Sequence, residues 1–133
     1  TPTKLLFDPG FSVIDAVTTK RAEKDYVMVL KDNTRPNRNL KISFAQQPEG
    51  PWSPASQAFT ESFVEGPTVV QIDTNYLIYF DVYQKKIYGA MRTTDFVNFT
   101  DITNEVSVPK DHKHGTIFRA PESIIEAMKK IAY

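Results

Sequence analysis

Two acidic residues stand at matching places in two similar stretches of the chain. Asp15 lies 11 residues before Tyr26, and Glu65 lies 11 residues before Tyr76. Apolar residues precede each carboxylate, and an apolar setting removes water and raises the pKa of a carboxyl group. Two carboxylates that face one cleft can divide acid and base roles between them. The structural alternative, two strand-end carboxylates that cap backbone amides, stays open beside this catalytic interpretation.

The two histidines of the chain, His112 and His114, add a second kind of titratable group. Their spacing puts both on one face of a strand, but a metal site would need a further ligand, and the only close carboxylate is Asp111. A surface or structural role is favoured for His112. His114 begins a third repeat unit, so we expect it to face the same channel as the two carboxylates.

Aromatic residues supply possible stacking surfaces for sugar rings. Packing between blades is the alternative, and we favour it for Trp52. Asp81 and Tyr83 follow the second strand of the second repeat, which predicts a position at the channel mouth. Candidate stacking residues are Trp52, Tyr79, Tyr83 and Tyr88.

The elements that position these residues repeat with an offset of 50, since Tyr26 to Leu30 lies over Tyr76 to Phe80. A period near 50 residues with four short strands is typical of a β-propeller blade. We expect four-stranded antiparallel blades over residues 11–60 and 62–108, a strand at 113–119 and a short helix at 122–132. Both Tyr-led runs lack alternation, so we expect them to be covered on both faces.

Composition restricts the classes of function. The chain of 133 residues has 16 basic and 16 acidic residues, and this balance disfavours nucleic-acid binding. It has no cysteine, which excludes a disulfide scaffold and a thiolate nucleophile. No apolar run is long enough to span a membrane. Propellers need about four blades or more to close, so two blades predict that the chain is the C-terminal part of a larger propeller.

The motifs resemble glycoside hydrolase family 43, whose members are five-bladed β-propellers that include arabinofuranosidases, β-xylosidases and arabinanases. The resemblance runs from about Lys4 to Phe118. Its most specific parts are the Glu-Gly-Pro element at 65–67 and the Lys-His-Gly-Thr element at 113–116. Phe99 stands where the family usually has Trp. The fold class implied is all-β, with two full blades and part of another.

The resemblance implies roles for individual residues. Glu65 matches the general acid, and Asp15 matches the carboxylate that raises the acid's pKa. His114 matches a channel histidine that positions sugar or a channel metal ion such as Ca²⁺. Tyr83 and Arg119 are candidates for substrate binding. The general base has no counterpart in this chain.

The function implied is inverting hydrolysis of O-glycosidic bonds in pentose-containing plant polysaccharides such as arabinan, xylan and arabinoxylan. No cofactor is required beyond the possible channel Ca²⁺. The alternative is a non-catalytic carbohydrate-binding or interaction module that keeps the propeller cavity. Expected partners are an oligo- or polysaccharide and either further blades or a second copy of the chain. The resemblance suggests a secreted or periplasmic location.

Overall fold

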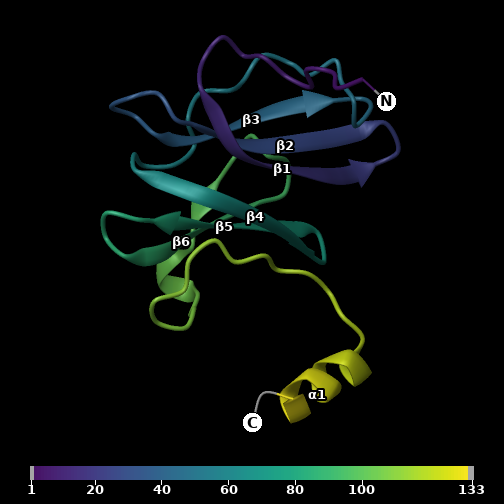
Figure 1. The fold of residues 1–133 in the computed structure, drawn as a ribbon, viewed down its shortest axis with the longest axis vertical. Coiled ribbons are helices and arrows are strands. Elements are labelled where there is room, and N and C mark those ends of the chain that lie inside the picture. The colour runs from purple at the N-terminus through teal and green to yellow at the C-terminus, as the bar shows by residue number, and fades with distance from the viewer. Residues whose placement is uncertain (1, 132–133) are drawn as a thin grey trace.

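The chain forms two antiparallel β-sheets stacked as layers, with a helix that stands apart at the C-terminal end (Figure 1). The computed structural model describes residues 2–131. The first sheet has the order β1-β2-β3, and the second has the order β4-β5-β6-β7. The strands are β1 (Val13–Ala22), β2 (Asp25–Asp32), β3 (Asn39–Ala45), β4 (Val64–Ile72), β5 (Asn75–Val82), β6 (Ile87–Thr93) and β7 (Thr100–Asp101). The fold is therefore all-β with consecutive antiparallel strands, as propeller blades have, and the two sheets do not form a closed ring.

The apolar core lies between the two sheets. Val27 and Val29 of β2 pack in one cluster with Ile78 and Phe80 of β5, and all four are at most 2% exposed. The run in β2 is covered on both faces, as its sequence predicted. In the run from Tyr76 to Phe80 of β5 only alternate residues are buried, and Leu77 and Tyr79 are half-buried. The prediction of two covered faces is thus wrong for this run, because only the face that carries Tyr76, Ile78 and Phe80 packs into the core.

The first sheet has three strands rather than the expected four. The segment 53–60 runs beside β3, but serine and threonine hydroxyls accept several of the bonds that a strand's carbonyls would take. The Ile42 amide donates to Ser56 Oγ at 2.9 Å, and the Leu40 amide donates to Thr60 Oγ1 at 3.0 Å. Hydroxyl groups that bond locally compete with ladder pairing in this way. Phe59 then joins this segment to the loop before β7 by stacking on Phe99, with ring centres 4.2 Å apart.

The segment 113–119 is not the strand that the sequence predicted. Its backbone amides donate to side chains instead of to a neighbouring strand. The acceptors are Asp81 Oδ2 for His114, the Tyr88 hydroxyl for Gly115 and Thr68 Oγ1 for Ile117. A segment whose donors are satisfied by side chains has no need of a ladder. The segment follows the short 3₁₀ helix η1 (Thr103–Glu105) and the irregular stretch after it.

Helix α1 (Glu122–Ile131) begins where the sequence predicted. The predicted last residue, Ala132, lies outside the described residues. None of the helical residues is buried, and the helix lies away from both sheets (Figure 1). Among residues 2–131, no helix is long and apolar enough to cross a membrane.

Candidate active site

The structure brings Asp15, Glu65 and His114 together where β1, β4 and the segment after η1 meet. One ligand-type atom from each residue lies within 4.8 Å of the other two. Asp15 Oδ2 also accepts a hydrogen bond from the Gly66 amide at 3.2 Å, which links the first sheet to the second. These three residues, with the Lys31 and Asp81 side chains that contact them, are called the cluster below.

A β-bulge in each first strand turns the acidic residues toward one space. Asp15 and Ala16 stand opposite one residue of β2, and Gly66 and Pro67 stand opposite one residue of β5. A bulge inserts an unpaired residue and re-aims neighbouring side chains, often beside active sites. Asp15 therefore corresponds in the structure to Gly66, one position from the equivalence with Glu65 that the sequence predicted. In a regular strand, a shift of one residue turns the side chain to the opposite face of the sheet. The extra residue in each bulge compensates for this shift.

Gly66 allows His114 to approach the strand. Gly66 has φ +58°, in the left-handed region that glycine enters at low cost. A Cβ at this position would overlap the imidazole ring of His114. His114 itself has φ +48°, and Asp15 has φ +51°. Three residues with unusual backbone conformation thus shape one small region.

Lys31 is the residue that decides the charge state of Glu65. Its ammonium nitrogen lies 2.8 Å from Glu65 Oε2, and its side chain is 3% exposed. Burial alone would raise the pKa of Glu65. The hydrogen bond and positive charge of Lys31, with smaller effects of His114 and Lys113, outweigh burial and lower that pKa below its ordinary value. The expectation of a raised pKa at Glu65 is therefore wrong in direction, since it counted Asp15 and did not foresee Lys31.

Asp81 provides the second buried charge of the cluster. Its Oδ2 accepts the His114 backbone amide at 3.1 Å and lies 3.6 Å from His114 Nε2. Burial raises the pKa of Asp81, and Glu65 raises it further, against the lowering effect of His114. Burial also raises the pKa of Tyr88, whose hydroxyl accepts the Gly115 amide at 2.6 Å. Asp81 and Tyr88 thus fix the backbone that carries His114.

The remaining predicted substrate residues lie at the edge of this region or outside it. Tyr83 packs edge-on against Phe63 and has the Lys31 ammonium 5.3 Å from its ring centre. Arg119 donates to the Gln71 carbonyl at 2.9 Å, near the far end of β4. Gln71 lies six positions along the strand from Glu65, which corresponds to roughly 20 Å. The structure therefore does not bring Arg119 to the cluster.

The cluster is a poor match for the Ca²⁺ ion that the resemblance implied. Ca²⁺ takes six to eight oxygen ligands. Here Asp15 and Glu65 supply carboxylate oxygens and His114 supplies a nitrogen. The Lys31 ammonium already holds the second oxygen of Glu65, so a divalent cation at this place would face a buried positive charge. The donor set and the charge both disagree with a channel Ca²⁺ site.

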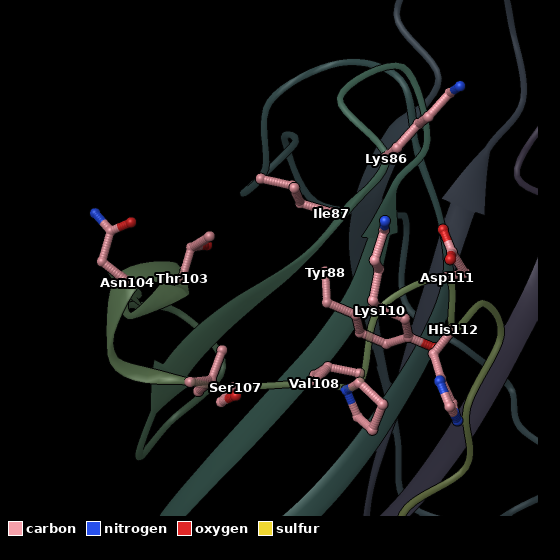
Figure 2. Close-up of a pocket in the computed structure, with 12 residues that line it drawn as sticks. Lys86, Ile87, Tyr88, Thr103, Asn104, Ser107, Val108, Lys110, Asp111 and His112 are labelled. Carbon is pink, nitrogen blue, oxygen red and sulfur yellow. The ribbon is translucent and has the colours of Figure 1, made fainter.

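Two adjoining cavities extend outward from the edge of the cluster. The nearer, of about 280 Å³, is lined by Asp81, Tyr83 and Lys113 among others. The second, of about 420 Å³, shares four lining residues with it, and Figure 2 shows Thr103 and Asn104 on one side of this cavity with Asp111 and His112 on the other. His112 thus lines a cavity beside the cluster without belonging to it.

Lys31 is the residue of the cluster that the sequence analysis did not anticipate. A signal was present, because Lys31 interrupts the apolar run of β2 at the position where β5 has Asp81, 50 residues later. A charge inside a buried strand calls for a partner. The repeat alone did not say which carboxylate that partner is.

Comparison with known proteins gives one match. A family model described as a probable glycosyl hydrolase domain, related to glycoside hydrolase family 43, matches residues 1–123. Neither the curated proteins nor the solved structures yielded a match. The matched range includes both sheets and every residue of the cluster. Because the match covers most of the chain, the chain belongs to this family of probable glycosyl hydrolase domains related to family 43.

Proposed function

We propose that this domain takes part in inverting hydrolysis of O-glycosidic bonds in pentose-containing plant polysaccharides such as arabinan, xylan and arabinoxylan. The observation that carries the proposal is the convergence of Asp15, Glu65 and His114 within 4.8 Å in a family of probable glycosyl hydrolase domains. Carboxyl groups held in one cleft are the groups that glycoside hydrolysis uses.

In this proposal Glu65 is the proton donor. The Glu65 carboxyl group gives its proton to the glycosidic oxygen while the bond from that oxygen to the anomeric carbon breaks. A water attacks the anomeric carbon from the opposite face, and a base about 6.5–9.5 Å from the donor takes the water's proton. Asp15 acts as the neighbouring negative charge that favours protonated Glu65, and His114 contacts the sugar. The base is not among the residues that we assign.

The Lys31 ion pair sets a condition on this mechanism. Lys31 favours the carboxylate form of Glu65, whereas a general acid must carry a proton. Donation therefore requires an acidic medium or a substrate complex in which the contact between Lys31 and Glu65 is lengthened. The two adjoining cavities, of which the nearer is lined by Asp81 and Tyr83, offer a path along which a sugar chain reaches the cluster.

The same ion pair favours a second candidate function, a carbohydrate-binding module without catalysis. An ionised Glu65 accepts hydrogen bonds from sugar hydroxyls but donates no proton. This candidate uses the same cavities and the same residues. It differs from the hydrolase in one measurable respect, because the bound sugar is released without cleavage of its glycosidic bonds.

Hydrolysis and binding assays on the same protein separate the two functions. We would measure 4-nitrophenol release from aryl arabinofuranosides and aryl xylosides, and calorimetric binding of arabinan and xylan oligosaccharides. Hydrolysis of pentosides with much slower hydrolysis of matched aryl hexosides supports the first proposal. Binding without any hydrolysis from pH 4 to 8 supports the module. Neither hydrolysis nor binding of these sugars contradicts both.

Association is part of the proposal. We propose that the open sheets pair with further blades or with a second copy of the chain. Large apolar side chains lie exposed on the described residues, among them Leu5, Phe118, Met128 and Ile131. Exposed apolar area of this kind is typical of interaction surfaces.

A further inference from the structure

The cluster contains two buried charges that occupy the same place in successive repeats. Lys31 is the seventh residue of β2, and Asp81 is the seventh residue of β5. Their side chains are 3% and 4% exposed, respectively. Each reaches into the following unit, Lys31 to Glu65 and Asp81 to His114. The repeat therefore places one buried cation and one buried anion at equivalent points around the cluster.

Lys31 is held in a built position rather than on a free surface. Its ammonium bonds to Glu65 Oε2 at 2.8 Å and lies 5.3 Å from the centre of the Tyr83 ring. Tyr83 is itself fixed by an edge-on contact with Phe63, with ring centres 6.2 Å apart. An ammonium over an aromatic face is attracted by the ring quadrupole, more strongly when water is excluded. Lys31 thus has a carboxylate on one side and an aromatic ring on another.

Lys31 also divides the two oxygens of Glu65 between two partners. Oε2 faces Lys31, and Oε1 lies 3.6 Å from His114 Nε2. The carboxyl group of Asp15, whose Oδ2 also accepts the Gly66 amide, completes the group whose ligand-type atoms lie within 4.8 Å. A metal ion placed among these three atoms would be separated from Lys31 by a single carboxylate group. Two positive charges at such a short separation repel each other strongly in a site that is partly shielded from water.

We infer that the Lys31 ammonium is the resident cation of the cluster, in the role that a bound divalent metal would otherwise fill. It neutralises Glu65, holds Oε2 and leaves Oε1 directed at His114. The cluster therefore assembles without a metal ion. This inference goes beyond the proposed function, because it concerns cation binding and holds whether the site hydrolyses sugars or only binds them.

Calorimetric titration of the metal-free 133-residue chain with Ca²⁺, and separately with Zn²⁺, tests the inference. The wild-type protein should show no saturable binding at its cluster, and its melting temperature should be the same in EDTA and in either metal. Lys31→Met removes the charge at similar length and should raise Ca²⁺ affinity by about tenfold or more, because the repulsion is gone. Lys31→Arg keeps the charge and should bind as weakly as wild type.

Lys85→Met is the matched control. Lys85 forms an ion pair of 2.7 Å with Glu61, but both side chains are about half exposed. Its replacement should leave Ca²⁺ affinity unchanged. Saturable binding by wild type that Glu65→Gln or Asp15→Asn abolishes would overturn the inference, and so would a folded Lys31→Met protein with unchanged affinity.

A second readout covers the case in which Lys31→Met does not fold. The carbonyl-carbon shift of the Glu65 side chain can be followed by NMR in wild type and in Lys31→Arg during the same titrations. An unmoved Glu65 signal in both proteins supports the inference. A Glu65 signal that shifts and saturates with either metal overturns it. Neither readout uses sugar, so failure of the proposed hydrolysis would leave this result standing.

Discussion

At the scale of single residues, the cluster is controlled by charges that the general acid–base scheme does not include. Glu65, whose side chain is 26% exposed, forms an ion pair with the buried Lys31. Asp81 is almost fully buried and accepts a hydrogen bond from the backbone amide of His114. The pKa of Glu65 is lowered and that of Asp81 is raised, so folding favours the ionised form of Glu65 and the protonated form of Asp81. Neighbouring groups rather than residue type decide which one is ionised.

Replacing Glu65 with Gln tests the proposed proton donor. Gln keeps the size and removes the proton, so hydrolysis of natural oligosaccharides should fall by about a hundredfold or more. Aryl glycosides with a good leaving group need little protonation and should be affected far less. Initial rates on both substrate classes measure the difference. Glu61→Gln, a change at an exposed glutamate, is the control. Equal rates of hydrolysis of natural oligosaccharides and aryl glycosides after Glu65→Gln would contradict the assignment.

The two carboxyl groups should also have opposite effects on stability. The folded state lowers the pKa of Glu65, so its ionised form stabilises the fold above the unfolded value, and this contribution is lost as pH falls through the lowered pKa. Glu65→Gln should therefore cost about 1–3 kcal/mol at pH 7 and progressively less in acid. Urea unfolding at several pH values measures this. A cost that does not vary with pH would contradict the ion pair.

Asp81→Asn should show the reverse pattern. The folded state raises the pKa of Asp81, so its stabilising contribution is full below the unfolded value and is lost as pH rises through the folded value. Asn keeps an acceptor for the His114 amide and carries no charge. The variant should gain stability relative to wild type between pH 4 and pH 7 in the same urea experiment. A relative loss over this range would show that the Asp81 charge is needed.

Gly66→Ala tests the close approach of His114. Alanine in the left-handed region costs about 1–2 kcal/mol, and the Cβ would in addition displace the imidazole. Gly10→Ala separates the two effects, because Gly10 also has a positive φ, of +79°, and nothing near its missing Cβ. Urea unfolding and the imidazole NMR signals of His114 are the measurements. We expect Gly66→Ala alone to move those signals, and equal effects of both variants would contradict the contact.

At the scale of elements, hydroxyl side chains replace ladder bonds beside β3. Ser56 Oγ accepts the Ile42 amide at 2.9 Å and donates to the Gln57 carbonyl at 2.6 Å. Ile42 is 1% exposed, so its amide would have no water to bond if Ser56 lost its hydroxyl. The segment 53–60 therefore stabilises β3 through side chains, and the fourth position of the first sheet depends on residue identity rather than on strand propensity.

Ser56→Ala should lower the free energy of unfolding by about 1–2 kcal/mol, because a buried amide is left unpaired. Ser107→Ala, at an exposed serine, is the control and should change stability by less than about 0.5 kcal/mol. Chemical denaturation with the same baseline for all three proteins gives the values. If both variants have the same free energy of unfolding as wild type, the hydrogen bond to the Ser56 hydroxyl contributes nothing to stability.

At the scale of the whole molecule, two stacked sheets leave apolar surface uncovered. In the second sheet, one face of β5 packs into the core, whereas Leu77 and Tyr79 on its other face are half-buried. Helix α1 carries exposed Ile124, Met128 and Ile131 away from both sheets (Figure 1). Exposed area of this kind costs roughly 25 cal/mol per Å² relative to burial. Association with further blades or with a second copy would remove that cost.

Sedimentation velocity over a range of concentrations tests this association. The 133-residue chain should sediment with a mass above its 15.1 kDa monomer, and the fraction of larger species should rise with concentration. High salt strengthens apolar association and weakens ionic association, which separates the two causes. A stable, monodisperse 15.1 kDa monomer at every concentration would contradict the proposal.

The sequence by itself determined the all-β character of the chain and predicted that three candidate site residues come together. The offset of 50 between Tyr26 and Tyr76 predicted two equivalent strands, and apolar runs and turn residues act locally, so they can be read from the chain. The same repeat predicted that Asp15, Glu65 and His114 face one space. The strands follow from local backbone preference and from the face that each must bury, and the repeat aligns the acidic residues early in the first strand of each unit.

Only the tertiary structure decided the charge of the site and the form of its last elements. Lys31 and Glu65 are 34 residues apart and meet because two sheets stack. The bulges shifted the expected equivalence by one residue, and side-chain acceptors replaced strands at 53–60 and 113–119. Ionisation depends on which groups lie within a few ångströms after packing. A linear pattern does not contain those distances, so the partner of Glu65 emerged only from the fold.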